Sequence, residues 1–218
     1  MGSISRATIV ALATTALSPA LLAQSRHSHD FSAERLVAPP TDGWLTNGGN
    51  LYNQRYSPLN QIDTANVAAL KGVWRARLNG SGAAPQYSGE AQPVVHDGVA
   101  YVSTGANDVF ALSLDTGEIL WQYTADLPAD LPSVCCGWNN RGVAISEDKV
   151  FMGRLDGKLV ALDRATGSPV WTIQAERPEE NFSITPAPVY YDGIVITGFA
   201  GADRGTRGRV KAYDADDG

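Results

Sequence analysis

The fold is decided by the stretch Leu159-Val-Ala-Leu-Asp-Arg-Ala-Thr-Gly-Ser-Pro-Val-Trp171, because two other parts of the chain repeat its pattern. The equivalent alanines Ala111, Ala161 and Ala212 lie 50 and 51 residues apart. In each copy two apolar segments joined by Asp-Gly or a similar turn precede the stretch. Short strands at this period are typical of the four-stranded antiparallel blades of a β-propeller. The sequence therefore predicts an all-β propeller.

About three blades fit into the chain, and the third copy reaches only Gly218, before the tryptophan that ends the two earlier copies. Because a propeller needs more blades to close, we expect this chain to be the N-terminal part of a longer propeller. Trp74, Trp121 and Trp171 are predicted to pack between neighbouring blades. The only helical signal is a turn near Asp63 to Leu70.

Composition and the first residues limit the class of protein. The 218 residues include 17 basic and 23 acidic side chains, a net charge of −6, which disfavours nucleic acid as a partner. Residues 1–23, with Arg6 before an apolar run, are predicted to be a secretory signal peptide, since the run is too short and interrupted for a membrane span. Residues 24–40, including His27 and His29, are predicted to be a flexible lead-in. Residues 41–218 are the propeller part.

The two cysteines, Cys135 and Cys136, are adjacent in sequence. This spacing excludes a long-range disulfide staple and a two-residue redox or zinc motif. Two interpretations stay open: a strained ring disulfide forming a rigid, flat, apolar plate on a loop, or two buried thiols that pack as small apolar groups. An oxidising, secreted destination makes the disulfide chemically reasonable.

Two motifs carry a resemblance to a known family. The Ala-x-Asp-x-x-Thr-Gly-x-x-x-Trp end of the repeat resembles the tryptophan-docking motif of quinoprotein dehydrogenases. Cys135-Cys136 followed by Asn140-Arg141-Gly142 resembles more specifically the methanol- and ethanol-type alcohol dehydrogenases that use pyrroloquinoline quinone (PQQ). The resemblance runs from about Gly43 to Gly218. It implies an eight-bladed propeller with PQQ on its axis, stacked on a Cys135–Cys136 disulfide.

The resemblance also implies which residues bind the cofactor. Glu90 resembles the glutamate at the rim of PQQ, and Arg141 resembles the arginine that pairs with it, since a planar guanidinium can bind carboxylate or quinone oxygens. Thr185 matches the threonine that hydrogen-bonds a PQQ carboxylate. Their ordinary alternatives are a solvated loop carboxylate, a surface ion pair and a strand-edge hydroxyl. The implied cofactor-binding set is Glu90, Cys135, Cys136, Arg141, Thr185, Ala200, Gly201 and Ala202.

The loop 198–208 resembles the family segment that supplies backbone amides and a metal ligand. Gly201 and Ala202 are expected to let the main chain approach a cofactor carboxylate closely. Ala200 stands where the family usually has serine, and Asp203 stands where a glutamate ligates the metal. A carboxylate suits Ca²⁺, with a lanthanide not excluded, but the shorter Asp203 side chain reaches less far. Its alternative is an ordinary turn residue.

The function implied is oxidation of an alcohol to an aldehyde or ketone, with PQQ as hydride acceptor and the metal as Lewis acid. The family's catalytic base lies beyond this chain, so no catalytic residue is assigned within it, and residues 1–218 alone are expected to be inactive. The implied partners are a small alcohol and a cytochrome c acceptor, in the periplasm. Competing hypotheses are a non-catalytic propeller scaffold, such as an outer-membrane assembly factor, and a polymer- or sugar-type quinoprotein dehydrogenase.

Overall fold

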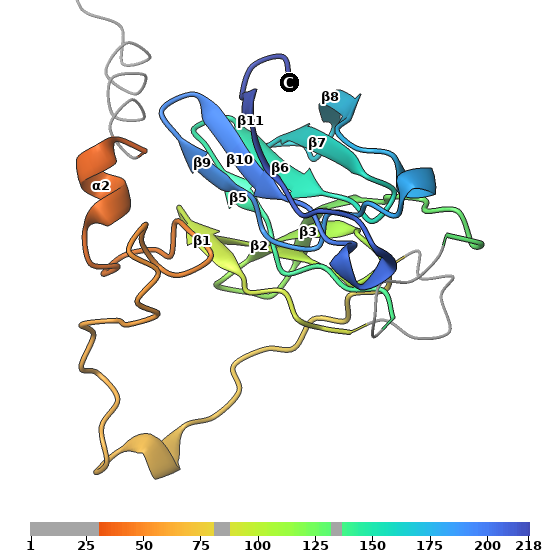
Figure 1. The fold of residues 1–218 in the computed structure, drawn as a ribbon. Helices are drawn as coiled ribbons and strands as arrows, with labels where there is room; N and C mark the ends of the chain where they lie inside the picture. The colour runs from red at the N-terminus through yellow and green to blue at the C-terminus, as the bar shows by residue number, and fades with distance from the viewer. Residues whose placement is uncertain (1–30, 81–87, 132–136) are drawn as a thin grey trace, which may run out of the picture.

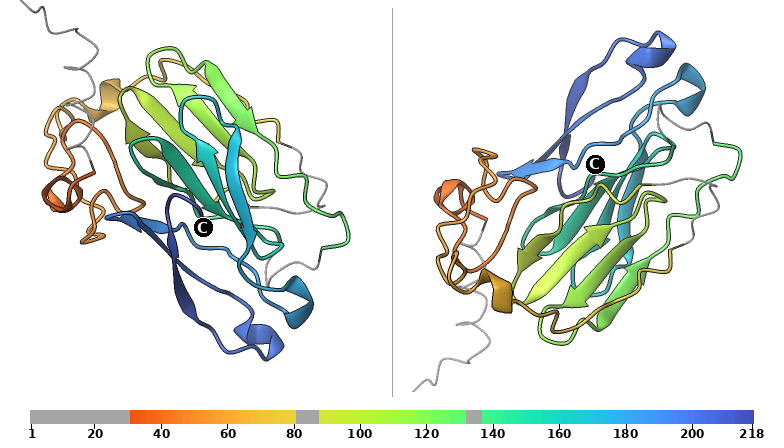
Figure 2. Two further views of the ribbon diagram at one scale, coloured as in Figure 1. Left: turned by 90° about the horizontal axis from the view of Figure 1, so that it is seen from above. Right: turned by 90° about the horizontal axis from the view of Figure 1, so that it is seen from below.

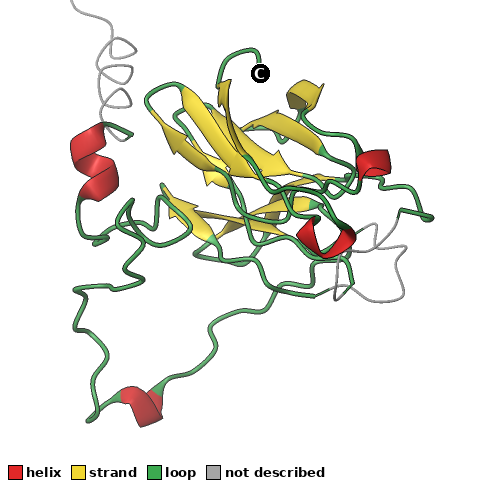
Figure 3. Cartoon of the chain, viewed as in Figure 1, coloured by secondary structure: helices red, strands yellow, loops and turns green. Residues whose placement is uncertain are grey.

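The computed structural model describes residues 31–80, 88–131 and 137–218, and its regular structure there is mainly antiparallel strand (Figures 1 and 3). The strands form three sheets in chain order, two of four strands and one of three. Within each sheet every strand pairs with its neighbour in sequence, which is the blade pattern predicted from the repeat. The first sheet contains β1 (Val94–His96), β2 (Val99–Ser103), β3 (Val109–Ser113) and β4 (Ile119–Tyr123).

The second sheet contains β5 (Ala144–Ile145), β6 (Lys149–Gly153), β7 (Lys158–Asp163) and β8 (Pro169–Gln174). The third contains β9 (Val189–Tyr191), β10 (Ile194–Gly198) and β11 (Val210–Asp214). Tight Asp-Gly turns join β1 to β2 and β9 to β10. Asp97 and Gly98 have φ values of 48° and 72°, the left-handed pair that a two-residue hairpin turn requires.

The middle sheet is buried on both faces. In Figure 2 it lies between the other two sheets. Because side chains alternate along a strand, Val150 and Met152 of β6 join the core shared with the first sheet, whereas Phe151 joins the core shared with the third. All five β6 residues are buried as a result, while β11 of the third sheet alternates between exposed and half-buried positions.

Tryptophans connect one sheet to the next, as predicted. The Trp121 indole N–H donates to the Arg164 carbonyl at 3.0 Å, and the Trp171 indole N–H donates to the Ala215 carbonyl at 3.1 Å. The Trp121 ring lies so close to Gly167 that a β-carbon there would clash with it. The Gly in each Thr-Gly turn therefore makes room for the tryptophan of the preceding blade, which explains why the two recur together.

Helical structure is sparse. The helix α2 (Ala33–Val37) begins after Ser32, whose hydroxyl accepts the Arg35 N–H at 3.3 Å. Three short 3₁₀ turns follow in the described ranges: η1 (Val67–Ala69), η2 (Pro178–Glu180) and η3 (Ala202–Arg204). The turn η1 lies in the stretch predicted to be helical, near Asp63 to Leu70. In the described ranges, none of the helices has the length and apolar character needed to cross a membrane.

The predicted flexible lead-in, 24–40, is structured over the part that the structure describes. Phe31 and Leu36 are buried and belong to the core between the first two sheets. The Leu51 N–H donates to the Leu36 carbonyl at 2.9 Å, which ties α2 to the following segment. This short helix packs against the core because of its apolar side chains. The sequence analysis did not count those side chains as core residues.

Candidate cofactor site

The segments that lead into the innermost strands β1, β5 and β9 meet at Arg141. The Gln92 N–H donates to the Arg141 carbonyl at 3.3 Å, and the Arg141 N–H donates to the Thr185 carbonyl at 3.0 Å. The Asn47 side-chain amide donates to the same Arg141 carbonyl at 2.8 Å. One residue from each blade and one from the N-terminal segment therefore converge on this point.

The side chain of Arg141 forms an ion pair with Glu90. Arg141 Nη2 and Glu90 Oε2 are 2.9 Å apart, and the Ser88 hydroxyl donates to the other oxygen, Glu90 Oε1, at 2.9 Å. Both side chains are part-exposed, 47% for Arg141 and 38% for Glu90. The structure thus brings two of the predicted residues together, with a guanidinium whose remaining N–H groups are available to an anionic ligand.

Asn140 holds the loop that carries Arg141. Its side-chain oxygen accepts from the Ser103 hydroxyl at 2.6 Å and from the Gly142 N–H at 3.0 Å, and its amide donates to the Gly153 carbonyl at 2.8 Å. Because Ser103 is on β2 and Gly153 on β6, this buried amide joins the first two blades directly below the loop. The sequence analysis noted Asn140 as part of a motif but missed this positioning role.

Two further residues at this point were missed by the sequence analysis. Asn47 comes from the segment 43–53, far from any motif, and the Gln92 side-chain amide lies between the Asn47 carbonyl and the Arg55 guanidinium. Gly142, with φ of 131°, packs so closely that a β-carbon would lie 2.9 Å from Asn47 Nδ2. The contact of Asn47 with Arg141 spans 94 positions, and the contacts of Gln92 also join separate segments, so no local pattern could have indicated them.

Thr185 and the 200–206 loop are joined by a short bridge. Thr185 is buried, and two residues earlier Ser183 exchanges both backbone hydrogen bonds with Ala200, at 3.2 and 2.9 Å. Thr185 and Ala200, both predicted site residues, therefore lie on neighbouring segments of the backbone. The bridge places the start of the predicted amide-bearing loop beside the segment that contacts Arg141.

Gly201 is required by the packing of its own loop. It has φ of 136°, and a β-carbon there would lie 2.5 Å from the Thr206 hydroxyl and closer still to the Asn181 carbonyl. Ala202 and Asp203 follow in η3, where Asp203 is half-exposed and its carboxylate lies 4.0 Å from Arg204 Nε. The sequence analysis expected the glycine to allow approach to a cofactor. The close approach seen here is to Asn181.

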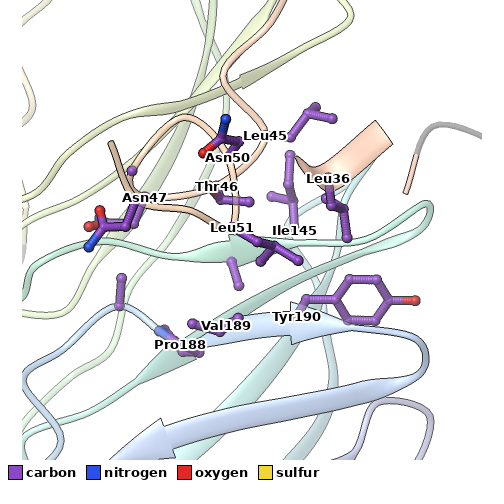
Figure 4. Close-up of a pocket in the computed structure, with 14 residues that line it drawn as sticks. Leu36, Leu45, Thr46, Asn47, Asn50, Leu51, Ile145, Pro188, Val189 and Tyr190 are labelled. Carbon is purple, nitrogen blue, oxygen red and sulfur yellow. The ribbon is translucent and has the colours of Figure 1, made fainter. Parts of the chain in front are cut away.

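A mainly apolar cavity of about 340 Å³ adjoins this cluster, because Asn47 lines it as well (Figure 4). Its walls come from α2, the segment 45–53, β5 and β9. Tyr190 is the titratable side chain among them, and burial raises its pKa. Its lining residues in the described ranges include no charged side chain, so the cavity is not suited to a charged cofactor.

Comparison with models of known protein families assigns the chain to a family. Residues 44–218 match the family model described as PQQ, glucose/ethanol/alcohol dehydrogenase, β-propeller domain. The chain belongs to this PQQ propeller family. The fold and family that the sequence analysis inferred are thereby confirmed.

Similar proteins include alcohol dehydrogenases named as quinoproteins and quinohemoproteins. The chain is 40% identical over 203 residues to quinoprotein alcohol dehydrogenase PedH of Pseudomonas putida, covering 93% of this chain and 33% of the relative. It is 42% identical to 1-butanol dehydrogenase (cytochrome c) of Thauera butanivorans, covering 78% and 24%. The crystal structure of quinohemoprotein alcohol dehydrogenase from Comamonas testosteroni superposes with a TM-score of 0.76 at 36% identity, covering 89% and 28%. The chain thus spans about a third or less of these relatives.

The described residues fit one side of a PQQ-family site. PQQ is a planar polyanion, and Arg141 presents a part-exposed cation held in place by Glu90 and by three backbone contacts. Cys135 and Cys136, predicted to form the plate under the cofactor, lie outside the described residues, as do the predicted signal peptide, His27 and His29. Trp138, two residues after Cys136 in sequence, is buried against Ala106 and Leu155.

Asp203, the metal ligand that the resemblance implies, is not part of a ligand cluster in the described residues. Within the ranges that the structure covers, no group of three or more histidine, cysteine, aspartate or glutamate side chains lies close enough to hold a metal ion. Asp203 stands with one nearby charged partner, Arg204. A metal at Asp203 would need its other ligands from outside these residues.

Proposed function

We propose that the protein containing this chain oxidises an alcohol to an aldehyde or ketone with PQQ as its redox cofactor. The observation that carries the proposal is the convergence of Glu90, Arg141 and Thr185 from three blades, in a chain that belongs to the PQQ propeller family. Relatives named as alcohol dehydrogenases support the alcohol as substrate class.

Each residue of the cluster has a role that follows from its contacts. Arg141 would hold an anionic edge of PQQ, because its guanidinium is oriented by Glu90 and its main chain is held by the Thr185 and Gln92 segments. Glu90, with one oxygen on Arg141 and one on the Ser88 hydroxyl, would fix the direction of that guanidinium. Thr185 would donate its hydroxyl to the same ligand.

The remaining predicted residues complete one side of the site. A Cys135–Cys136 disulfide would form an apolar plate against one face of the cofactor, and the backbone of Ala200, Gly201 and Ala202 would border its edge. When bound, PQQ supplies the two-electron acceptor for the oxidation. No described residue is placed to remove the alcohol proton, so that base would come from elsewhere in the polypeptide.

Asp203 is proposed as one ligand of a metal ion that accompanies the cofactor, either Ca²⁺ or a lanthanide. A europium-containing methanol dehydrogenase, similar to this chain with a TM-score of 0.73 and 36% identity, supports the lanthanide alternative, because europium is a lanthanide. Asp203 is half-exposed and lightly paired, so its carboxylate is available. Unchanged metal dependence of PQQ-linked dye reduction in Asp203→Ala would contradict this assignment.

We further propose a periplasmic location and a cytochrome c acceptor. The location follows from the predicted signal peptide over residues 1–23. The acceptor is suggested by the name of the Thauera relative, which includes cytochrome c. Following the reduction of added cytochrome c, with alcohol as the electron source, would test the second part.

The central test is cofactor binding by the polypeptide that the gene encodes. Tryptophan fluorescence would be followed as PQQ is added to the cofactor-free protein. Arg141→Gln is expected to weaken binding by roughly 10- to 100-fold, the effect of losing a charge-assisted contact. Arg177→Gln is the matched control, since Arg177 is exposed and its ion pair with Glu180 lies on η2. A wild-type protein that binds no PQQ would leave the non-catalytic propeller as the better explanation.

A further inference from the structure

The loop that carries Asp203 is much longer than the equivalent loops of the other blades. The connection between the second and third strands covers residues 104–108 in the first blade and 154–157 in the second, but residues 199–209 in the third. A longer loop has more conformations available, so it keeps a side chain in one position only where further contacts restrict it. The position of Asp203 therefore depends on what holds the two ends of this loop.

The end of the loop is held by Glu176, which follows β8 in the second blade. Glu176 Oε1 lies 2.9 Å from Arg209 Nη1 and 2.7 Å from Lys211 Nζ. Lys211 Nζ also donates to the Ala175 carbonyl at 3.0 Å. Arg209 is the last residue of the loop, and Lys211 is the second residue of β11. One carboxylate of the second blade thus holds the point where the loop re-enters the third blade.

Glu176 presents its carboxylate from a fixed position. The residue is 7% exposed, its N–H donates to the Gly157 carbonyl at 3.0 Å, and its own carbonyl accepts from the Gln174 side-chain amide at 2.6 Å. The packing is close, because a β-carbon on Gly157 would lie 2.2 Å from the Glu176 carbonyl oxygen. Solvent screening and side-chain motion weaken surface ion pairs, but they have less effect on a buried carboxylate with a fixed backbone. The two ion pairs can therefore keep the end of the loop in a fixed position relative to the second blade.

The two cations also contact aromatic rings at the base of the loop. The Arg209 guanidinium carbon lies 4.6 Å from the centre of the Phe182 ring, and Lys211 Nζ lies 5.4 Å from the centre of the Phe199 ring. The two rings meet edge to face, with centroids 6.3 Å apart. The Phe199 N–H donates to the Arg209 carbonyl at 3.1 Å, which joins the first residue of the loop to the last. The ion pairs of Glu176 thus act on a base that is already packed.

Asp156 in the second blade has the same chemistry but a different connection. It is buried and forms ion pairs with one arginine and one lysine, Arg154 at 2.7 Å and Lys158 at 3.4 Å. These three residues belong to the short β6–β7 connection and the first residue of β7, so the pairs close a single hairpin. Glu176, in contrast, joins two blades. Comparing the two carboxylates therefore separates the anchoring of the long loop from the general cost of losing a buried ion pair.

We propose that Glu176 is a positioning residue for the candidate metal ligand Asp203. The bridge between Ser183 and Ala200 holds the start of the loop, and Glu176 holds its end. With both ends held, the Asp203 carboxylate keeps a defined position, which reduces the conformational entropy that metal binding has to remove. The metal role of Asp203 rests on the proposed function, whereas the anchoring of the loop does not.

Amide hydrogen exchange on the metal-free polypeptide that the gene encodes tests the anchoring by itself. The N–H groups of Arg204, Gly205 and Thr206 donate within the loop, so their protection reports its order. Glu176→Gln keeps the shape of the side chain and removes its charge, and it is expected to speed the exchange of these amides on the order of 10-fold. Asp156→Asn is expected to leave their exchange unchanged. Unchanged exchange in Glu176→Gln, or equal acceleration in both variants, would overturn the proposal.

Metal affinity tests the consequence for the site. Ca²⁺ or La³⁺ would be titrated by calorimetry into each variant with PQQ bound. We expect Glu176→Gln to weaken metal binding about 10-fold, as supporting residues of metal sites commonly do, and Asp156→Asn to bind like the wild type. Metal affinity that is unchanged in Glu176→Gln would overturn the positioning role. A wild type that binds no PQQ would overturn the proposed function and the metal part of this inference, and the exchange experiment would then decide the anchoring alone.

Arg209→Gln provides a second variant in case Glu176→Gln does not fold. Arg209 is 49% exposed, so its loss leaves no buried charge, and Glu176 keeps its pair with Lys211. We expect Arg209→Gln to speed loop exchange and to weaken metal binding in the same direction as Glu176→Gln, by a smaller factor. Wild-type exchange and wild-type metal affinity in Arg209→Gln would contradict the proposal.

Discussion

Replacing Asn140 by alanine is expected to destabilise the fold more than any other single change near the cofactor site. The substitution removes three hydrogen bonds at once, to the Ser103 hydroxyl, the Gly142 N–H and the Gly153 carbonyl. Asn140 is fully buried, so bulk water does not reach these groups when the amide is gone. Each lost bond costs about 1 kcal/mol, and an unsatisfied buried group costs about 1–3 kcal/mol.

The expected loss is therefore about 3–5 kcal/mol, a large fraction of the roughly 5–15 kcal/mol that stabilises a typical domain. Urea unfolding followed by tryptophan fluorescence would measure it. Asn139→Ala is the matched control: Asn139 is the adjacent residue and is equally buried, but its side-chain oxygen has no hydrogen-bond partner in the described residues. The control is expected to lose about 1 kcal/mol or less.

The same pair of variants links stability to the site. Because Asn140 joins β2 to β6 beneath Arg141, its loss is expected to weaken PQQ binding even at temperatures where the fold persists. The reasoning fails if Asn140→Ala loses less than about 1 kcal/mol, or if Asn139→Ala loses as much. In either case the loop would be held by other contacts.

Three further outcomes follow from the structure. Gly201→Ala is expected to lower the free energy of unfolding by about 1–3 kcal/mol and to weaken PQQ binding, because φ is 136° and the Asn181 carbonyl occupies the position of the new β-carbon. Gly205→Ala is the control, since Gly205 has φ of 87° and open space around it. Thermal melting would compare the two variants. Hydrogen bonds from Thr166, of which the side-chain bond has the largest effect, lower the pKa of Asp163. The contribution of Asp163 to folding stability is therefore present above its unfolded-state pKa and is lost as pH falls through its folded-state pKa. The stability difference between wild type and Asp163→Asn should therefore shrink on acidification, and a difference that grows towards low pH would refute this. Trp171→Phe should cost about 1 kcal/mol beyond the change in ring size, read from urea unfolding, through loss of the bond to the Ala215 carbonyl.

The blades were predictable because their signals are local. The apolar run of β6, the Asp97-Gly98 turn and the tryptophan after each Thr-Gly turn are all contained within a few residues. The resemblance also singled out two residues that are distant in sequence and close in space, since the Arg141 guanidinium forms an ion pair with Glu90. The same local pattern recurs every 50 or so residues, so a strand or turn that is ambiguous in one copy can be identified from the other copies.

The rest depends on partners that no local pattern reveals. Asn47 contacts Arg141 across 94 positions, and Leu36 is buried although its helix has only five residues. Short helices have weak intrinsic stability, so α2 exists because of the core against which it packs.

The location of the candidate site follows from the phase of the repeat, that is, from the position of each residue relative to the innermost strand of its blade. Glu90, Arg141 and Thr185 each precede the innermost strand of a blade by three or four residues, at β1, β5 and β9. Innermost strands converge as blades are arranged in a ring, so residues at this phase are neighbours although they are distant in sequence. Each additional blade would add one more residue at this phase to the same site.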